Sequence, residues 1–451
     1  MYHMESNCNK LRIDSMDVRK INLEEILLPS GYQIEVFAQG LNTPSSILFT
    51  KEGDLYTADS GYTNGMPNVQ KLVNGHFEMY ADDFKVPLIG INSLDGNIYV
   101  SHRGTITVLK KDGSRQDIIK GLPSDGDYSN SKVDFGPDGK MYFGLGTATN
   151  SGVVGPDNSW VFRYPYFYDN PGSDIELVGQ NFRSQNLLVP SDNEIVYTGA
   201  FSPYGVANSP SETRKKVIKA SGGILRANLD GSELELVAWG LRSISYLKFN
   251  KEKRLYASND GFDIRGSRPI AQAPDEFQLI TPGAWYGWPD YSAGEPVTLP
   301  KFKPEGGKQP EFLLVDHPGI PPKPFSVFPN NSTIIGFDFN YNKDFGPYGD
   351  IYISEFGYVV PFTYEISEPP FTGAGHRVSK IDSKTGVVST FAINKTGFPG
   401  YYTGGGGLGR PSDIAFGPDG AMYILDMGLN LKDDPNTFIP NTGVIWKVTR
   451  K

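Results

Sequence analysis

The chain has a single cysteine, Cys8, among its 451 residues. One cysteine excludes an intramolecular disulfide, a zinc site built from cysteines, and an attached c-type haem, which needs two cysteines followed by a histidine. The sequence also lacks any run of 18 apolar residues, and its first 20 residues contain no apolar segment of the length that a secretory signal needs. We therefore expect no disulfide, no transmembrane helix and, in the sequence as written, no signal peptide.

Basic charge and helical periodicity are scarce as well. The 42 lysines and arginines are outnumbered by 51 aspartates and glutamates, which gives a net charge of −9. This balance offers no electrostatic basis for binding nucleic acid or an anionic membrane, and it favours a neutral or cationic small molecule as the partner. A helical pattern occurs only in a short stretch, Ile21–Leu28.

Glycine and proline are abundant, with 52 and 34 residues, and they indicate many tight turns between short strands. Six segments repeat one pattern, in which a turn is followed by a strand with a tyrosine. The first three tyrosines are evenly spaced, at a distance typical of one four-stranded propeller blade of about 40–45 residues. The six tyrosines are Tyr56, Tyr99, Tyr142, Tyr256, Tyr352 and Tyr423.

Asp-Gly and Pro-Asp-Gly turns suit the positive φ of a hairpin, and the residues after them alternate as in a half-buried strand. A single blade cannot bury both of its faces, so blades stack around an axis. The sequence thus predicts an all-β, six-bladed β-propeller of four-stranded antiparallel blades around a central channel. We expect residues 1–27 to form a loosely ordered N-terminal arm and residues 28–451 to form the single propeller.

The repeat also points to a ligand-binding face. Three residues after each tyrosine, mostly polar side chains stand at the strand ends, which should open onto one mouth of the channel. These residues are either ordinary turn residues before glycine or a ring around a binding site. They are Asp59, His102, Leu145, Asn259, Glu355 and Asp426.

One block is more specific than the repeat. Asp275–Gly283 reads DEFQLITPG and Tyr286–Pro289 reads YGWP, and this block resembles the glucose/sorbosone dehydrogenase family. The resemblance implies a six-bladed propeller that binds pyrroloquinoline quinone (PQQ) and Ca²⁺ and oxidises a sugar. Further matches extend it over nearly the whole chain, at Leu28–Leu41, Phe135–Asn150, Gly240–Arg242 and Gly409–Gly420.

The resemblance implies roles for several residues of this chain. Arg242 and Arg410 stand where family arginines hold the carboxylates of PQQ, a task suited to a guanidinium fork. Gly261 and Phe262 stand where backbone carbonyls bind Ca²⁺. Ser243 and Ser245 replace two longer polar side chains of the family beside the cofactor. Trp285 is either a platform for the quinone or sugar, or part of the blade packing.

The main departure concerns the catalytic base. The family has a histidine at the position of Tyr128, and a tyrosine with a pKa near 10 is almost fully protonated at pH 7. Asp127 and His102 are the alternative bases. Close to the PQQ positions, Asp263, Arg265 and Arg268 form either a polar wall over the pocket or an internal ion-pair loop.

Three functions therefore remain open. The first is a PQQ-dependent oxidoreductase that acts on a sugar, aldose or related polyol with Ca²⁺ and passes electrons to a soluble acceptor. The second is a non-catalytic propeller that binds a carbohydrate or a protein partner. The third is a metal-dependent hydrolase or lyase that uses the polar ring. Localisation stays open, because the family is mostly exported, whereas the sequence as written is also compatible with the cytoplasm.

Overall fold

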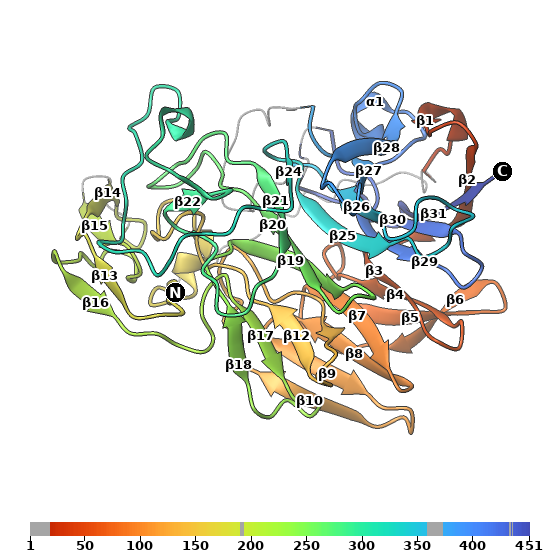
Figure 1. The fold of residues 1–451 in the computed structure, drawn as a ribbon, viewed down its shortest axis with the longest axis horizontal. Coiled ribbons are helices and arrows are strands. Elements are labelled where there is room, and N and C mark those ends of the chain that lie inside the picture. The colour runs from red at the N-terminus through yellow and green to blue at the C-terminus, as the bar shows by residue number, and fades with distance from the viewer. Residues whose placement is uncertain (1–18, 190–193, 359–372, 433, 435) are drawn as a thin grey trace.

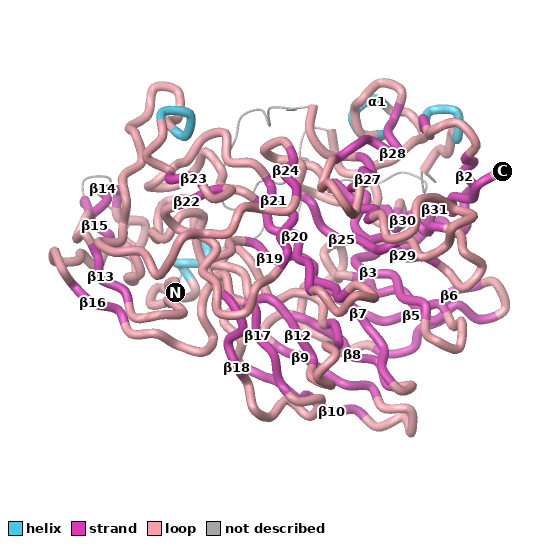
Figure 2. The backbone as a smooth tube through the Cα atoms, in the orientation of Figure 1, coloured by secondary structure: helices cyan, strands magenta, loops and turns pink. Residues whose placement is uncertain are grey.

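The computed structural model describes residues 19–189, 194–358, 373–432, 434 and 436–451. In this part of the chain, six antiparallel sheets are arranged as the blades of a β-propeller (Figure 1), so the predicted fold is confirmed. Helices are short: 3-10 turns η1 (Leu23–Glu25), η2 (Ser159–Phe162) and η3 (Pro300–Phe302), and one α-turn, α1 (Gly400–Thr403) (Figure 2). None of the described helices is long and apolar enough to cross a membrane.

Blades 1 and 2 are compact, with four consecutive strands each. Blade 1 comprises β3 (Pro44–Phe49), β4 (Leu55–Asp59), β5 (Asn68–Val73) and β6 (His76–Ala81). Blade 2 comprises β7 (Leu88–Leu94), β8 (Asn97–His102), β9 (Thr105–Leu109) and β10 (Arg115–Lys120).

Blades 3 and 4 are interrupted by long insertions between their strands. Blade 3 comprises β11 (Asp134–Phe135), β12 (Met141–Gly144), β17 (Ile224–Ala227) and β18 (Glu235–Ala238). Blade 4 comprises β19 (Ser243–Phe249), β20 (Leu255–Asp260), β21 (Asp275–Leu279) and β24 (Ser326–Phe328).

Blades 5 and 6 include strands from the start of the described chain. Blade 5 comprises β25 (Ile334–Phe339), β26 (Ile351–Glu355), β27 (Arg377–Ile381), β28 (Val388–Asn394) and a fifth strand, β1 (Ile26–Leu27). Blade 6 comprises β29 (Pro411–Phe416), β30 (Met422–Asp426), β31 (Gly443–Arg450) and β2 (Tyr32–Leu41). Because β2 pairs with the last strand, the two ends of the described chain close the ring.

The repeat tyrosines explain why the sequence pattern found the blades. Each lies in the second strand of its blade, from β4 to β30, and each is buried in an apolar cluster that also draws on other strands. A large buried ring at this position fills the wedge between neighbouring sheets. The spacing of the tyrosines therefore reports the spacing of the blades.

The segment before the propeller packs against blade 6. Arg19 is buried, its Nη2 lies 2.7 Å from Asp426 Oδ2, and it also donates to the carbonyls of Thr442 and Gly407. Residues 1–18 of the predicted arm lie outside the described residues. The boundary at residue 28 stays a prediction.

The insertions of blades 3 and 4 pack together beside the propeller, on the left in Figure 1. A bridge joins Leu177 to Leu314, and Trp239, Trp285 and Trp288 belong to the apolar cluster beneath them. The paired elements are β13 (Ile175–Leu177) with β16 (Glu212–Arg214), β14 (Asn181–Gln185) with β15 (Ile195–Gly199), and β22 (Tyr291–Ser292) with β23 (Glu295–Pro296).

Candidate functional site

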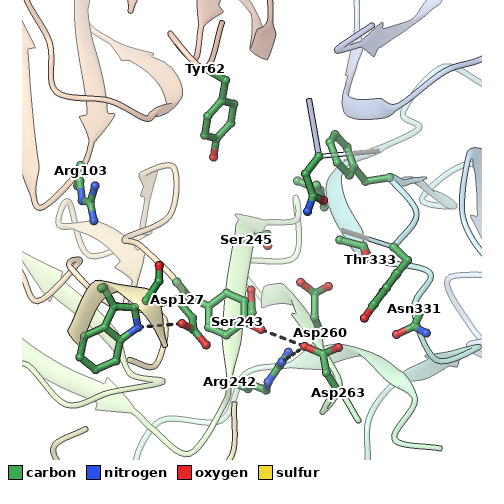
Figure 3. Close-up of a pocket in the computed structure, with 18 of the residues that line it drawn as sticks. Tyr62, Arg103, Asp127, Arg242, Ser243, Ser245, Asp260, Asp263, Asn331 and Thr333 are labelled. Carbon is green, nitrogen blue, oxygen red and sulfur yellow. Dashed lines mark hydrogen bonds and ion pairs between the residues drawn. The ribbon is translucent and has the colours of Figure 1, made fainter. Parts of the chain in front are cut away.

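A cavity of about 760 Å³ opens at one mouth of the central channel (Figure 3). Such a volume falls in the range of roughly 300–1,000 Å³ that small-molecule sites occupy. A deeper space of about 230 Å³ continues it, shares Tyr128, Ser243 and Ser245 in its lining, and reaches Lys132. There, Lys132 Nζ lies 3.2 Å from Asp413 Oδ2 and donates to the Tyr246 hydroxyl at 2.9 Å. This buried ion pair forms the floor.

Blade 4 supplies one wall through the ends of its first two strands. Ser243 and Ser245 lie on β19, and Asp260 ends β20; all three line the cavity, as Figure 3 shows. Arg242 stands just before β19, where its backbone N–H donates to the Asn259 side chain at 2.8 Å. The strand ends expected to open onto the channel therefore do so in this blade.

Arg242 is fixed from several sides. Its Nη2 lies 2.5 Å from Asp263 Oδ2 and 2.8 Å from Asn150 Oδ1, and the guanidinium lies 4.6 Å from the centre of the Tyr128 ring. Among the described residues, its Nη1 donates to none, although Arg242 lines the cavity. A buried arginine held in this way keeps one nitrogen for a ligand.

Tyr128 lies between two arginines. Its hydroxyl accepts a hydrogen bond from Arg265 Nη2 at 3.1 Å and lies 3.5 Å from Asp263 Oδ2. Burial raises the pKa of Tyr128 well above its ordinary value, although Arg242 and Arg265 act in the opposite direction. Tyr128 therefore keeps its proton at neutral pH and can donate or accept a hydrogen bond.

Arg265 holds three loops together beneath the cavity. Its nitrogens lie 2.7 Å from Asp127, 2.5 Å from Asp157 and 3.1 Å from Asp263, and its side chain is only 1% exposed. Asp127 also accepts from the side chains of Asn158 and Trp160, at 3.0 and 2.9 Å. Asp127 is thus committed to anchoring the loops, which leaves it poorly suited to act as a base.

Asp263, Arg265 and Arg268 were expected to form either a polar wall over the pocket or an internal ion-pair loop, and the structure divides them between the two. Arg268 is buried in an ion pair with Asp290, so Arg265 and Arg268 are internal. Asp263 instead lines the cavity, and its ion pairs and its contact with Tyr128 all use Oδ2. Burial acts to raise the pKa of Asp263, but the charges of Arg242 and Arg265 hold it below its ordinary value. Asp263 is therefore ionised.

Two further carboxyl groups lie in the wall beside Gly261. Asp275 accepts from the backbone N–H groups of Gly261 and Thr333, at 2.8 and 2.7 Å. Burial raises the pKa of Asp260 to about 7, against the opposing effect of Arg242, and burial with the neighbouring Asp260 raises the pKa of Asp275. Asp260 Oδ1 is buried and has no hydrogen-bond partner among the described residues. This oxygen is suited to a proton or a cation.

Gly261 is required by close packing. A Cβ at this position would lie 2.4 Å from the carbonyl oxygens of Ala273 and Pro274. Gly261 lines the cavity, whereas Phe262 is buried in the apolar cluster of the insertions. The orphaned Asp260 oxygen next to Gly261 fits a Ca²⁺ ion, which accepts carboxylate and carbonyl oxygens together. Within the described residues, no group of three or more His, Cys, Asp or Glu side chains forms a metal site without such carbonyls.

Besides Phe262, three of the expected site residues do not line the cavity. His102 is enclosed in blade 2, where Nδ1 accepts from the Lys85 N–H at 3.0 Å and Nε2 lies 2.8 Å from Thr107 Oγ1. Trp285 is buried and stacks on His317 at 5.3 Å, so its ring packs within the insertions.

Arg410 is the third of these residues. It is fully buried and donates to the carbonyls of Gly357 and Tyr358, at 3.1 and 2.9 Å, and to Asn430. Tyr358 lines the cavity, so Arg410 supports the wall rather than reaching a ligand directly.

The predicted polar ring is not brought together, because each member is bound to its own surroundings. Asp59 accepts from Thr43 and Gly61, Asn259 from Arg242, and Glu355 from Ser379. Asp426 accepts from the N–H groups of Gly409 and Arg410 and pairs with Arg19. These residues cap strand ends, and the interpretation as a metal-dependent hydrolase or lyase loses its basis.

The sequence pattern missed three kinds of lining residue. Asp260 stands beside Gly261, and its position at a strand end was the only signal. Trp160 and Phe162 lie on η2, within an insertion that carries no motif. Tyr62 and Phe438 come from different loops and meet only in the fold, with their rings stacked 6.0 Å apart.

The architecture is that of the six-bladed propellers found among sugar dehydrogenases. The PQQ-bound aldose sugar dehydrogenase of Streptomyces coelicolor matches with 16% identity and a TM-score of 0.51, over 94% of this chain and all of that one. The PQQ domain of pyranose dehydrogenase from Coprinopsis cinerea matches with 12% identity and a TM-score of 0.58, over 96% and 98%.

A calcium structure of a family AA12 carbohydrate-active enzyme from Trichoderma reesei matches with 14% identity and a TM-score of 0.54, over 97% and 100%. No protein-family model matches the chain, and no curated protein does. At these identities the likeness shows a shared fold, which is also the fold of these sugar dehydrogenases.

Proposed function

We propose that this protein is an oxidoreductase that binds PQQ and Ca²⁺ at the channel mouth and oxidises a hydroxyl group of a sugar, aldose or related polyol. One observation carries the proposal: a buried oxygen of Asp260, unpaired among the residues that the structure describes, lies beside Gly261 in the wall of the same cavity that Arg242 lines. The fold shared with a PQQ-bound aldose sugar dehydrogenase supports it.

For the cation, the donor set has the right chemistry. Asp260 would supply a carboxylate oxygen and Gly261 its carbonyl, both hard oxygen ligands of the kind that Ca²⁺ prefers. A bound cation would also draw the proton from Asp260, because a nearby positive charge favours the ionised carboxylate. Phe262 remains a candidate for a second carbonyl.

For PQQ, Nη1 of Arg242 donates to none of the described residues, and Arg103 and Arg163 also line the cavity. Guanidinium groups suit carboxylates because they donate two parallel hydrogen bonds. Ser243 and Ser245 would add hydroxyl donors on the inner wall. PQQ with Ca²⁺ supplies an electrophilic quinone that accepts a hydride from an alcohol carbon.

The protein must also take a proton from the substrate hydroxyl. Tyr128 holds its own proton, Asp127 is engaged by three donors, and His102 is enclosed in blade 2. We assign the proton-accepting role to Asp263, which is ionised, lines the cavity and uses Oδ2 for its ion pairs. Tyr128 then orients the substrate hydroxyl through its own O–H.

A non-catalytic propeller that binds a carbohydrate or protein is the second candidate. The hydrogen bond from Arg265 to the Tyr128 hydroxyl favours it, together with burial that raises the pKa of Tyr128, at the position where the family has a histidine. In that case ligand binding would persist while oxidation would be absent.

The test is a calorimetric titration of the purified protein with PQQ, with added Ca²⁺ and again with a chelator. We expect one-to-one binding that depends on Ca²⁺, together with dye-linked oxidation of at least one aldose or polyol, the dye standing in for a soluble acceptor. The variant Asp263→Asn should lose at least 100-fold in turnover. Asp112→Asn, in an exposed hairpin turn of blade 2, is the matched control. Absence of PQQ binding at saturating Ca²⁺ would refute the proposal.

A further inference from the structure

The floor of the channel carries a lysine that the proposed function does not use. Lys132 stands just before β11, is only 5% exposed, and lines two spaces of the channel. One is the space of about 230 Å³ that continues the mouth cavity, and the other, of about 170 Å³, lies further along β19, beside Leu247 and Lys248. A primary amine is thus placed in the middle of the channel, where it borders the open space that leads to the mouth.

The side chain of Lys132 is held in one place. Its stem passes over Gly90 of β7, where a Cβ would lie 2.7 Å from Lys132 Cβ. Nζ lies 3.2 Å from Asp413 Oδ2 on β29, and it donates to the Tyr246 hydroxyl at 2.9 Å and, more weakly, to the Ile47 carbonyl at 3.4 Å. An amine, a phenol and a carboxylate therefore meet at one point, and their positions are set before any ligand arrives.

Burial favours the neutral form of this amine. It lowers the pKa of Lys132, and Lys248 acts in the same direction, whereas Asp413 and Asp338 act against it. Burial also raises the pKa of Tyr246, so its hydroxyl keeps its proton at neutral pH. A lysine becomes a nucleophile when desolvation lowers its pKa in this way, and Schiff bases with carbonyl compounds are the typical products.

The lining of the inner space decides which carbonyl compounds fit. Among the described residues that line it, Lys132 is the only cationic side chain, against the carboxylates of Asp127 and Asp413. An anionic ligand, such as a keto acid, would therefore bury its carboxylate without a partner, at a high desolvation cost. Hydroxyl groups are plentiful, and a serine hydroxyl can both donate and accept hydrogen bonds. The serines that line this space are Ser45, Ser46, Ser129, Ser243, Ser245 and Ser412.

We propose that Lys132 is a site of covalent attachment for a short, neutral hydroxyaldehyde, which it binds as a Schiff base at the floor of the channel. The amine, Tyr246 and Asp413 carry the reaction, and the serines hold the hydroxyl groups of the aldehyde. This site is independent of PQQ and of sugar oxidation.

The reaction needs no oxidant and no cofactor. Lys132 passes one proton to Asp413, and its neutral amine attacks the carbonyl carbon, while a second N–H proton passes through Tyr246 to the carbonyl oxygen. The proton on Asp413 then reaches the new hydroxyl group through Tyr246, the C–O bond breaks with its electron pair on oxygen, and water leaves as the nitrogen lone pair forms the C=N bond. The product is an iminium ion, so a cation still faces the Asp413 carboxylate and the buried ion pair is kept.

Reductive trapping tests the proposal on the whole protein. With limiting glyceraldehyde at pH 7, cyanoborohydride reduces each imine to a stable amine, and peptide mass spectrometry measures the rate at each lysine. We expect Lys132 to be labelled at least about ten times faster than Lys384, which lies exposed in the turn after β27, because a pKa lower by one raises the neutral fraction about tenfold. Equal or slower labelling of Lys132 would overturn the proposal.

Two comparisons test its parts. Tyr246→Phe keeps the aromatic ring and removes the hydroxyl, so labelling of Lys132 should slow at least about tenfold while that of Lys384 is unchanged. An unchanged rate at Lys132 would overturn the role of Tyr246. Propionaldehyde has the same carbon chain without hydroxyl groups, and it should give a lower ratio of Lys132 to Lys384 labelling. A ratio equal to that of glyceraldehyde would overturn the hydroxyaldehyde as the class of ligand.

Discussion

Blade 2 and blade 3 start from the same repeat and end in different roles. Blade 2 completes its four strands between Leu88 and Lys120, whereas blade 3 runs from Asp134 to Ala238 with a long insertion between its second and third strands. In blade 2 the polar residue at the strand end, His102, is sealed by its own blade. By contrast, the polar residues Asp127 and Tyr128, just before blade 3, line the cavity. The repeat thus builds the ring, and the insertions build the site.

The two regions also differ in how they bury charge. Blade 2 buries the imidazole of His102, and this burial lowers its pKa so that the ring is uncharged at neutral pH. The loops around blades 3 and 4 bury a network in which Arg265 balances Asp127, Asp157 and Asp263. Burying unpaired charge is far more costly than burying a neutral ring. Removing one member should therefore have very different consequences in the two regions.

The largest effect is expected for Arg265→Met. The change leaves two almost completely buried carboxylates, Asp127 and Asp157, without their cation, and breaking a buried ion pair in this way costs about 3–5 kcal/mol. Urea denaturation should show this loss in the free energy of unfolding. Burial already raises the pKa of Asp157 to about 6, so the variant should lose less stability at pH 5 than at pH 8, because protonation relieves the unpaired charge.

The matched control is Arg226→Met on β17 of blade 3. Arg226 pairs with Asp138 and Glu235, but its side chain is 37% exposed, so the loss should stay below about 1 kcal/mol. If both arginine variants lose equal stability, the buried network is no more important than a surface ion pair, and the comparison between the regions fails.

The second effect concerns His102 and acid. Burial lowers the pKa of His102 to about 4 from its ordinary value of 6.5, with Arg115 and Lys85 acting in the same direction and Asp117 against it. Between about pH 6.5 and pH 4, the unfolded chain therefore binds a proton at His102, whereas the folded chain does not. The resulting stability is complete above about pH 6.5 and is lost as the pH falls toward 4, by about 3 kcal/mol.

His102→Asn removes the titration and keeps an acceptor for the Lys85 N–H. Urea denaturation of the native protein and the variant at pH 4.5, 5.5 and 7 should give a smaller loss of stability in acid for the variant. His76→Asn, an exposed histidine at the start of β6, serves as the control. Parallel pH curves for all three proteins would contradict the buried, neutral state of His102.

The propeller could be predicted from the sequence because the stacking of blades requires the same residue types at the same place in every blade. The hairpin turns, the tyrosines from Tyr56 to Tyr423 and their spacing all follow from burying one sheet against the next. The family resemblance, rather than the repeat, singled out Arg242, Tyr128, Ser243 and Ser245; all four line the cavity, and their roles stay predictions.

The remaining site residues were beyond a local pattern. His102 and Trp285 have the right chemistry but are enclosed by their neighbours, and enclosure depends on packing that no motif records. Arg265 reaches Asp127 and Asp157 across more than a hundred positions of the sequence. Such contacts arise from where the insertions fold, which the repeat does not specify.

The third effect concerns ligand binding, which we expect in the region of blades 3 and 4 and not in blade 2. If Asp260 supplies a carboxylate to Ca²⁺, then Asp260→Asn keeps an oxygen and removes the charge, and the affinity for Ca²⁺ in the presence of PQQ should fall at least tenfold, equivalent to about 1.4 kcal/mol. The variant should be no less stable without ligands, because Asp260 Oδ1 has no hydrogen-bond partner among the described residues. Calorimetric titration with Ca²⁺ measures the first quantity and urea denaturation the second. An unchanged Ca²⁺ affinity would remove Asp260 from the cation site.

The last prediction concerns Tyr128→Phe, which separates positioning from proton transfer. The ring stays beneath the Arg242 guanidinium, and the lost hydroxyl has one good partner, Arg265 at 3.1 Å, and one distant one, Asp263 at 3.5 Å. The loss should therefore be about 1 kcal/mol. If Tyr128 only orients the substrate, dye-linked turnover should fall about tenfold, whereas removal of a general base costs about 10²–10⁴-fold. A loss of 1,000-fold with unchanged PQQ affinity would make Tyr128 the base, and the raised pKa would then have to be overcome by the bound ligand.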